Sequence, residues 1–370
     1  MYEKEVVVIG GGPSGLSAAV EASKRGAKVL LVDENLRAGG QLFKQIHKFF
    51  GSSAHKAGVR GIDIAVDLLE QARVHGVEIW LNSVVVGLFK DKKVAIKRTF
   101  EDKLEKLEII QAKKIVIATG ASENAVSFRG WTLPGVMGAG AAQTMINVHR
   151  VLPGERILMI GSGNVGLIVS YQLLQAGAEV IAVIEAAPQI GGYGVHAAKI
   201  RRAGVPIYTS YTILEAKGEK YVEEAVICEV DKKWQPIIGT EKVLKVDTIT
   251  IAAGLKPLTE LAMMHDCQCS FIPQLGGWVP LHDKNMESTS PGIYLVGDVT
   301  GVEEANTALE EGRLAGTSIA EALNYISTEE AERLKKEIWQ RLNELRMGPF
   351  GEGRMLAKSN ILEECKASNC

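Results

Sequence analysis

The segment 5–15 reads EVVVIGGGPSG and decides the fold. An uninterrupted apolar run such as VVVI is typical of a strand that is buried on both faces. Six loop residues rich in glycine follow, and the small residues of 16–25 predict a helix closed by Gly26. A second apolar run, Val29–Val32, ends at Asp33. The order strand, glycine loop, helix, strand predicts a βαβ unit.

The same order returns about 150 residues later. The apolar residues of 156–160 lead into the glycine loop GSGNVG at 161–166. A helix over 167–175 is predicted next, and then a strand over 180–184 that ends at Glu185. A repeat with such a long period indicates a duplicated domain rather than a solenoid.

Each half continues with short apolar runs separated by polar turns, which predict a three-stranded meander and then a closing buried strand. In the first half these runs are Val84–Phe89, Val94–Phe100, Leu104–Ile110 and the separate closing strand Ile115–Gly120. In the second half they are Tyr211–Leu214, Val222–Val230, Val243–Val246 and Thr248–Ala253, followed by Gly254.

A third strand that ends at an acid, Gly292–Asp298, precedes a predicted helix over Thr307–Leu323. This unit has no sheet of its own, so we expect it to complete the first domain. The fold class is therefore α/β, with two nested Rossmann-like domains, three-stranded meanders and a C-terminal helix. The expected domains are 1–125 with 258–326, an inserted 126–257, and a helix and tail over 327–370.

The last helix is predicted to begin with the capping box Ser327–Glu330 and to run to about Met347. Its apolar residues recur every three or four positions and form one stripe, namely Ala331, Leu334, Ile338, Leu342 and Leu345. The stripe fits docking either on its own domain or on another subunit. Residues 348–370 are polar, so we expect a loosely ordered tail unless a partner holds it.

Composition excludes several classes of protein. The 370 residues suggest two or three domains. A net charge of −2 argues against a nucleic-acid partner, which would need a concentrated positive surface. No apolar run is long enough to predict a membrane span, and a first strand that begins by Glu5 leaves no room for a secretory signal. Five cysteines make no disulfide framework, which favours a cytoplasmic location.

The first glycine loop has the spacing G-x-G-x-x-G at Gly10, Gly12 and Gly15. In this pattern the first glycine permits the turn, the second lets a pyrophosphate approach the backbone, and the third lets the helix pack closely. The pyrophosphate lies at the positive end of the helix. Asp33, 23 residues after Gly10, is placed to accept hydrogen bonds from an adenosine ribose.

The second loop repeats this spacing at Gly161, Gly163 and Gly166. Its acid, Glu185, lies 24 residues after Gly161, so an offset from the ribose is possible. No Arg or Lys lies between Ile184 and His196, where a 2′-phosphate would require one, and this favours NAD over NADP. A vestigial site, or one that holds ADP or ATP, remains open.

Several motifs beyond the loops carry a family resemblance. Four segments resemble the FAD-contacting segments of thioredoxin-reductase-like flavoproteins, which hold FAD in the first fold and NAD(P)H in the second. These segments are Leu31–Asn35 with Gly39–Gln41, Ala118–Gly120 and Gly297-Asp298. Within that group, three segments resemble the FAD/NAD-binding subunits of heteromeric dehydrogenases, the class of sarcosine oxidase alpha, hydrogen cyanide synthase, opine oxidase and dye-linked proline or hydroxyproline dehydrogenases. These segments are Ala118–Glu123, Phe128–Met137 and Ala139–Gln143, and the similarity covers about residues 4–325.

The loops and the resemblance together give two sets of expected cofactor contacts. For FAD they are Gly10, Gly12, Pro13, Ser14, Gly15, Asp33, Glu34, Gly40, Gln41, Val85, Ala118, Thr119, Gly120, Gly297 and Asp298. For NAD they are Gly161, Gly163, Asn164, Val165, Gly166, Glu185 and Gly254.

No side chain is required as a nucleophile, because the cofactors carry the chemistry. His47 is a candidate proton donor near flavin N5, or else a surface or partner-contact residue. The helix near Thr307 would direct its positive end at the flavin N1–C2=O edge.

Disulfide reductases of this architecture place a cysteine pair beside the flavin, but residues 42–51 and 138–142 contain no cysteine. Dithiol chemistry is therefore not expected. Cys267, Cys269, Cys365 and Cys370 lack iron–sulfur spacing, so no metal site is predicted and a second polypeptide would supply any cluster. The basic, aromatic insertion 42–61 is expected either to dock an acidic electron carrier or to be an ordinary amphipathic helix and loop.

These observations predict an FAD-dependent NAD(H) oxidoreductase that acts as the electron-transfer subunit of a larger dehydrogenase. Its expected partners are an iron–sulfur protein and a substrate-oxidising subunit. Two alternatives remain open. One is a stand-alone NAD(P)H:acceptor reductase of the ferredoxin or diaphorase type, and the other is a structural subunit with FAD and ADP or ATP.

Overall fold

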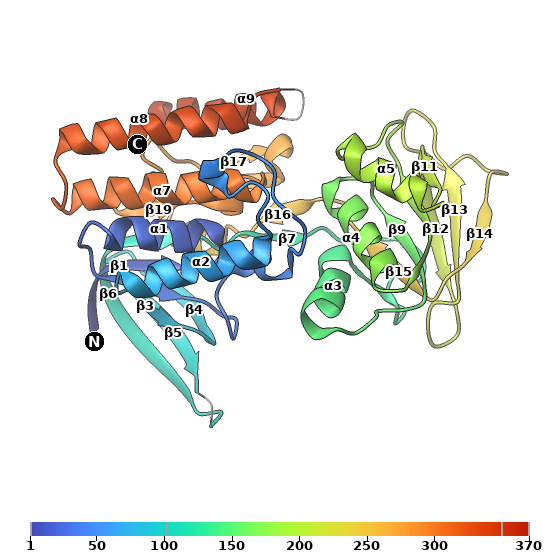
Figure 1. Ribbon diagram of the computed structural model, residues 1–370, viewed down its shortest axis with the longest axis horizontal. Coiled ribbons are helices and arrows are strands. Elements are labelled where there is room, and N and C mark those ends of the chain that lie inside the picture. Colours follow the sequence, from blue (N-terminus) through green and yellow to red (C-terminus); the bar gives the residue numbers. More distant parts are fainter. Residues whose placement is uncertain (1, 101, 349–350, 369–370) are drawn as a thin grey trace. The chain divides into compact units, whose positions relative to one another are not determined.

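The computed structural model describes residues 2–100, 102–348 and 351–368. The chain forms two compact units, one from residues 1–122 and 256–370 and the other from residues 123–255. The two crossings of the chain, β7 (Ala121–Glu123) and β16 (Leu255–Pro257), pair as a two-stranded sheet. The architecture is the expected α/β fold in which one Rossmann-like domain is inserted into another (Figure 1).

The first unit is built on a seven-stranded sheet with the order β3-β2-β1-β6-β5-β4 and with β19 paired to β6. Strands β1, β2, β3, β6 and β19 are mutually parallel, whereas β4, β5 and the start of β6 form the antiparallel meander. The bounds are β1 Tyr2–Ile9, β2 Val29–Val32, β3 Glu78–Trp80, β4 Ser83–Leu88, β5 Lys93–Thr99, β6 Glu105–Ile117 and β19 Ile293–Leu295.

One sequence-based expectation about this sheet is wrong. The third meander strand and the closing strand are not separate, because β6 runs unbroken for 13 residues. The connecting residues 111–114 contain neither glycine nor proline, and they pair with β1 in the same register as the residues on either side. A single strand therefore serves the meander at its start and the parallel sheet at its end.

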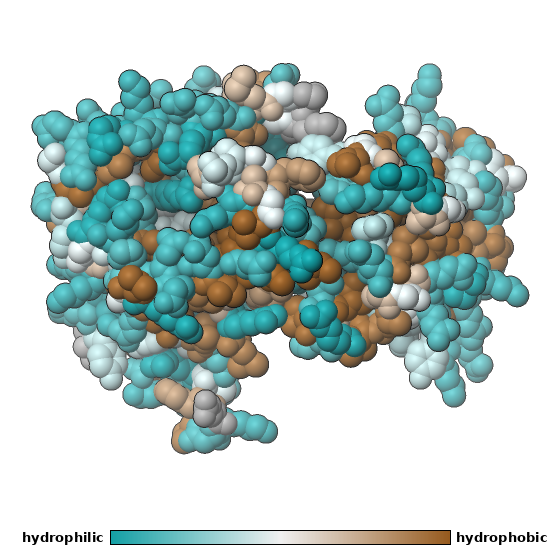
Figure 2. Space-filling view, in the orientation of Figure 1, coloured by the Kyte–Doolittle hydropathy of each residue, from teal (hydrophilic) through white to brown (hydrophobic). Residues whose placement is uncertain are grey.

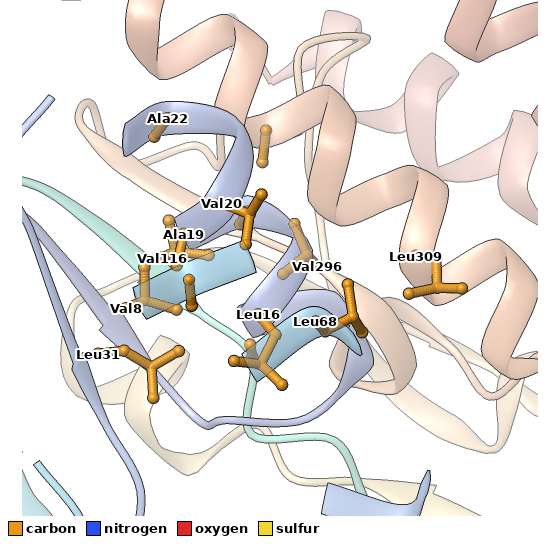
Figure 3. Packing of buried hydrophobic residues seen from close by; sticks show 14 of the residues in the cluster. Val8, Leu16, Ala19, Val20, Ala22, Leu31, Leu68, Val116, Val296 and Leu309 are labelled. Carbon is orange, nitrogen blue, oxygen red and sulfur yellow. The ribbon is translucent and has the colours of Figure 1, made fainter. Parts of the chain in front are cut away.

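Both faces of this sheet are buried, as the apolar run in β1 predicts. Val6 and Val8 belong to one core cluster, and Val7 and Ile9 belong to the cluster on the opposite face. Figure 3 shows the first cluster, in which residues of the sheet pack against helices α1 (Pro13–Ser23), α2 (Gly61–Val74) and α7 (Ala305–Ala322). This core fixes the strand ends from which the glycine loop emerges.

Helices α1 and α7 lie unusually close together. A Cβ added at Gly312 would lie 2.2 Å from the carbonyl oxygen of Ser14, and one at Gly316 would lie 2.7 Å from that of Ala18. The two glycines of α7 therefore allow it to pack directly on the backbone of α1. This contact brings the middle of α7 beside the first turn of α1.

Two helices follow α7, not one. Helix α8 (Thr328–Leu345) begins at Ser327, whose hydroxyl accepts the Glu330 N–H as the capping box predicts. Its apolar stripe docks on the chain's own first unit, since Ala331, Ile338 and Leu342 are buried and the last two join the core that contains α7. The surface over α8 is mainly hydrophilic (Figure 2).

The expectation of a loosely ordered tail is wrong for the described residues. Residues Glu352–Ala367 form helix α9. Its buried residues Ala357, Ile361 and Cys365 recur every four positions and pack in a small cluster with residues of the segment 272–281. That segment begins at the last residue of β17 (Cys269–Ile272) and includes β18 (Gly277–Pro280), which pairs with β17 as a hairpin. The four-residue spacing was the sequence signal for this helix.

Truncation of the α8 stripe tests its docking. Because Ile338 is only 3% exposed, we expect Ile338→Ala to lower the free energy of unfolding of the first unit by about 2–4 kcal/mol, the cost of a buried cavity. Urea denaturation would measure the change. Glu337→Ala, which removes only an exposed Arg333 ion pair, is the matched control and should cost less than about 0.5 kcal/mol.

The second unit repeats the parallel architecture in a five-stranded sheet with the order β11-β10-β9-β15-β8, beside a three-stranded meander. The sheet strands are β8 Val136–Gly138, β9 Arg156–Ile160, β10 Glu179–Glu185, β11 Ile207–Thr209 and β15 Thr248–Ile251. The meander is β12 Tyr211–Lys217, β13 Glu224–Glu229 and β14 Lys242–Lys245. The helices are α3 Ala139–Thr144, continued by a π-helical turn over 145–149, α4 Asn164–Gln175 and α5 Gly194–Arg202.

The insertion 42–61 is not an amphipathic helix. It contains short 3-10 turns at 40–44 and 53–55, and Gly51 between them adopts a φ of 117°, which a regular helix cannot accommodate. Phe49 is buried whereas Phe50 is exposed, so the two rings do not form one exposed surface. Phe50 is held to α7 through its carbonyl oxygen, which accepts a hydrogen bond from the Asn306 amide.

The first unit also contains the short helix α6, Glu260–Met264. Among the residues that the structure describes, no helix is both long and apolar enough to cross a membrane.

Candidate cofactor sites

The first glycine loop turns tightly between β1 and α1. Gly10 has a φ of 104°, and a Cβ there would lie 2.3 Å from the carbonyl oxygen of Ala118. A Cβ at Gly15 would lie 1.9 Å from the carbonyl oxygen of Gly10. Neither position accommodates a side chain, so the loop must be bare backbone here. Ala118, buried at the end of β6, contributes a wall of this turn through its main chain.

Gly12 differs from its neighbours because nothing fills the space beside it. A Cβ at Gly12 would meet no atom closer than the Cα of Gly40, at 4.0 Å. No side chain caps the N terminus of α1, and Pro13 occupies its first turn. The loop therefore leaves open space at the positive end of a helix, which is the arrangement that a pyrophosphate requires. The residues present thus fit the diphosphate of a dinucleotide.

Asp33 lies next to this loop, at the end of β2. Its side chain is buried, and Oδ2 accepts the Gly11 N–H at 2.6 Å while Oδ1 accepts the Asn35 N–H at 2.8 Å. Oδ1 also accepts the Asn35 side-chain amide at 2.9 Å, so Oδ2 is the oxygen that retains a second lone pair for a ribose hydroxyl. These contacts orient the carboxylate at the loop, whereas the neighbouring Glu34 is exposed.

Two further glycine segments pack against the loop. The Gly39 N–H donates to the carbonyl oxygen of Gly11 at 2.7 Å, and a Cβ at Gly40 would lie 2.7 Å from the Cα of Gly12. At Gly297 a Cβ would lie 2.5 Å from the Ser14 hydroxyl oxygen. The fold therefore brings together the loop and these two segments, which are widely separated in the sequence.

The remaining FAD expectations differ in their surroundings. Thr119 donates its hydroxyl hydrogen to the carbonyl oxygen of Leu258, and Gly120, with a φ of 74°, has open space beside it. Gln41 is exposed, Val85 is partly buried against the second core cluster, and His47 stacks on Phe49 at a ring-centroid separation of 5.9 Å. Direct cofactor contact by these residues stays a prediction.

The second glycine loop has the same geometry as the first. A Cβ at Gly161 would lie 2.3 Å from the carbonyl oxygen of Ala252, and one at Gly166 would lie 2.1 Å from that of Gly161. Gly163 has no atom within 4 Å of such a Cβ, and no side chain caps α4. Each steric restriction of the first loop recurs, and so does the open space.

Glu185 occupies the place in the second unit that Asp33 occupies in the first. Its Oε2 accepts the Ser162 N–H at 2.9 Å, just as Asp33 accepts the N–H of the second loop residue, Gly11. The Ser162 hydroxyl also donates to Oε2, at 2.7 Å. The one-residue difference in spacing therefore leaves the acid at the loop.

The sequence interpretation missed a second glycine pair. The Gly192 N–H donates to the carbonyl oxygen of Ser162 at 2.9 Å, which matches the contact from Gly39 to Gly11. A Cβ at Gly192 would lie 2.9 Å from the backbone of the Gly163–Asn164 bond. The signal was present, because Gly191 follows Glu185 by the same six residues that separate Gly39 from Asp33.

The other expected NAD contacts lie around this second loop. The Asn164 side-chain oxygen accepts the Tyr193 N–H at 2.9 Å, so it helps to hold the glycine pair. Val165 is 43% exposed on the first turn of α4, and the carbonyl oxygen of Gly254, also exposed, accepts the Asn124 N–H. These positions are compatible with nucleotide contact, which stays a prediction.

Asp298 leads to a prediction about pH. Burial raises the pKa of its carboxyl to about 6, the Glu303 N–H opposes this rise, and the nearby Glu311 carboxylate adds to it. If the ionised form accepts a flavin ribityl hydroxyl, FAD binding must lower this pKa, so affinity falls as the pH drops through 6. We expect the Kd for FAD to rise about tenfold from pH 7 to pH 5, as fluorescence titration would measure. Asp298→Asn should remove this dependence; a dependence that persists in the variant contradicts the assignment.

Cys267 and Cys269 are free thiols. Cys267 donates its S–H to the Ser288 hydroxyl, and burial raises the pKa of both Cys267 and Cys269, the latter to about 11. Both thiols are thus protonated at neutral pH. Within the part of the chain that the structure describes, no three His, Cys, Asp or Glu side chains are grouped as metal ligands, and Cys370 lies outside that part.

Two bare-backbone loops of matching geometry, each at the carboxyl ends of parallel strands, define a protein with two dinucleotide-binding folds. The chain belongs to the pyridine nucleotide-disulphide oxidoreductase family, whose model matches residues 4–312. It is thus an FAD-dependent pyridine-nucleotide oxidoreductase, although the stretches that carry the redox cysteines in disulfide reductases lack cysteine here. Family membership implies binding of FAD and a nicotinamide nucleotide.

Similar proteins are components of larger enzymes by name. The chain is 28% identical to the HcnB component of hydrogen cyanide synthase from Pseudomonas aeruginosa, over 92% of the chain and 76% of the relative. It is 28% identical to a component of opine oxidase from Agrobacterium tumefaciens, over 88% and 67%. It is 26% identical to the alpha chain of sarcosine oxidase from a Corynebacterium species, over 87% of the chain but only 33% of the relative.

Solved structures support the fold. The structure of thioredoxin reductase from T. acidophilum matches with a TM-score of 0.70 at 20% identity, over 88% of this chain and all of that one. L-proline dehydrogenase from P. horikoshii matches with a TM-score of 0.68 at 21% identity, over 92% of this chain and 59% of that one.

Proposed function

We propose that this chain is the FAD- and NAD(H)-binding electron-transfer subunit of a multi-subunit dehydrogenase. The observation that carries the proposal is the repeated loop geometry, in which Gly12 and Gly163 each leave open space at a helix N terminus next to a loop-bound acid. Such a repeat would give one chain two adenine-dinucleotide sites. The names of its relatives support a role within a larger assembly.

The residues of the first unit would bind and orient FAD. The α1 N terminus with Gly12 would hold the diphosphate, Asp33 the adenosine ribose, and Asp298 the ribityl chain. Bound FAD would supply the chemistry, since it can accept a hydride from a reduced nicotinamide and release electrons to a further acceptor. No side chain of this chain needs to act as a nucleophile.

The second unit would bind NAD(H) rather than NADP(H). Glu185 is held by the Ser162 N–H and hydroxyl and by the Ala187 N–H, so its carboxylate stays at the loop, where it would accept ribose hydroxyls and repel a 2′-phosphate. The absence of Arg and Lys between Ile184 and His196 supports the same preference. Electrons would pass between NAD and FAD in this chain, and between FAD and an iron–sulfur or substrate-oxidising partner.

Anaerobic titration of the purified chain tests this proposal. We expect a yellow protein whose flavin absorbance near 450 nm is bleached by about one equivalent of NADH, with NADPH at least tenfold less effective. Co-purification with the products of neighbouring genes should yield a complex that turns over an organic substrate. Rapid turnover with ferredoxin or dyes by the chain alone would instead indicate a stand-alone reductase. Tight ADP or ATP binding without bleaching by either nucleotide would indicate a structural subunit.

A further inference from the structure

A buried ion cluster lies beneath the expected flavin segment. The 3-10 turn Gly297–Thr300, called here the 297–300 turn, begins with Gly297 and Asp298. Glu311 on α7 lies against this turn, with only 2% of its surface exposed. Two cations that are each 4% exposed, Arg346 just after α8 and Lys358 on α9, complete the cluster.

The two carboxylate oxygens of Glu311 contact different parts of the fold. Oε2 accepts the Gly297 N–H at 2.9 Å and the Thr300 hydroxyl at 3.1 Å, both in the 297–300 turn. Oε1 accepts Nζ of Lys358 and Nη2 of Arg346, each at 2.8 Å. A single side chain thus links the expected flavin segment to the C-terminal helices.

Three further contacts strengthen the link. Lys358 Nζ also donates to the Thr300 hydroxyl oxygen at 2.6 Å. Arg346 forms two hydrogen bonds with Glu303, at 2.9 and 2.6 Å, and the Glu303 N–H donates to Asp298 Oδ1 at 3.3 Å.

The ion pairs of the cluster join equal numbers of carboxylates and cations. Two carboxylates, Glu303 and Glu311, face two cations, Arg346 and Lys358. Burial alone would raise the pKa of Glu311, but Lys358 and Arg346 lower it below its usual value, so the carboxylate stays ionised. Loss of one cation would therefore leave an uncompensated buried charge.

Helix α9 has limited apolar packing of its own. Its buried residues belong to the seven-residue cluster with the segment 272–281, separate from the main core. A cavity of about 110 Å³, lined in part by Met355, Leu362 and Trp339, lies beside the ion cluster. The charged contacts of Lys358 are thus a large part of what docks α9.

We propose that Glu311 is a positioning residue for FAD: it fixes the 297–300 turn, and it does so only when Lys358 and Arg346 dock the C-terminal helices onto it. The inference rests on the proposed FAD site of the first unit. It makes FAD binding and α9 docking reciprocal, because each stabilises the conformation that the other needs. Both cations lie beyond residues 4–312, which the family model covers.

The test compares three variants of the full chain. In Lys358→Met, Glu311 keeps the Gly297 contact but loses a buried cation, and we expect FAD affinity to fall about tenfold. In Glu311→Leu with Lys358→Met one carboxylate and one cation are removed together, yet the Gly297 N–H loses its acceptor and the Thr300 hydroxyl keeps only the Gly297 carbonyl oxygen. Here we expect stability to recover in part while FAD affinity falls about a hundredfold. Lys335→Met is the matched control, because Lys335 ties α8 to Glu321 of α7 without contacting the turn.

Three quantities are measured for each apoprotein: the Kd for FAD, the midpoint of unfolding in urea, and the Kd for NADH. The Kd for NADH should not change, because the proposed NADH site lies in the other unit. Hydrogen exchange of the wild-type chain provides a measurement that needs no variant: FAD should slow exchange in residues 352–367. The inference is overturned if the variants bind FAD as tightly as Lys335→Met does, or if FAD does not change the exchange rates of the α9 amides. Either result leaves the proposed function intact. A wild-type chain that binds no FAD overturns the proposed function itself.

Discussion

Gly12→Val is expected to yield a folded but colourless protein. Gly12 has open space beside it, and the added isopropyl group would occupy the place of the pyrophosphate. Its φ of −74° lies where any residue is tolerated, so the backbone itself carries no penalty. The variant should therefore lose cofactor affinity rather than stability.

The expected loss of FAD affinity is at least a hundredfold, since both the charge contacts at the α1 N terminus and the space for the diphosphate are removed. The measurements are the ratio of flavin to protein absorbance after purification and the Kd from fluorescence titration. Far-UV circular dichroism and the NADH affinity of the second unit should match the wild type. A stoichiometrically yellow Gly12→Val protein would contradict the placement of FAD in the first loop.

Gly163→Val should produce the reverse phenotype. Its position in the second loop matches that of Gly12, with no atom within 4 Å of an added Cβ. We expect a yellow protein with normal FAD content whose flavin is no longer reduced by NADH, because the nicotinamide nucleotide has lost its diphosphate site. The rate of flavin reduction at fixed NADH should fall at least a hundredfold in anaerobic stopped-flow experiments.

Each glycine variant is the control for the other. Dithionite should still reduce the flavin of Gly163→Val, which shows that only delivery from the nucleotide is lost. If NADH reduces the flavin of Gly163→Val at the normal rate, the second unit is not the nicotinamide site. In that case the ADP or ATP alternative for this unit would gain support.

Sequence patterns predicted the features that local chemistry determines. The apolar run of β1 and the glycine spacing predicted a doubly buried strand and a turn that excludes side chains. The repeated spacing also predicted the inserted second fold, because the same steric restrictions recur at Gly161 and Gly166. The α8 capping box was predicted for the same reason, since one hydroxyl and one N–H define it.

Features that depend on pairing or burial between distant segments could not be read in this way. The continuity of β6 depends on β1 as its neighbour, and no residue between Ile110 and Ile115 signals it alone. Helix α9 looks polar in the sequence because a lysine such as Lys358 is normally exposed. Lys358 is buried here only because Glu311, at a distant position, supplies its counter-charge. The composition of the tail thus predicted solvent exposure where the fold supplies a counter-charge.

The hydrogen bonds that join Gly39 to Gly11 and Gly192 to Ser162 run from main chain to main chain. These main-chain hydrogen bonds do not depend on the neighbouring side chains. Substitutions at those side chains can therefore change which coenzyme binds without breaking the hydrogen bonds that hold the glycine loop. In the second unit, the positions that can be substituted in this way are those just after Glu185. Under the proposed preference for NAD(H), we expect arginines introduced there to favour a coenzyme with a 2′-phosphate while the glycines stay unchanged.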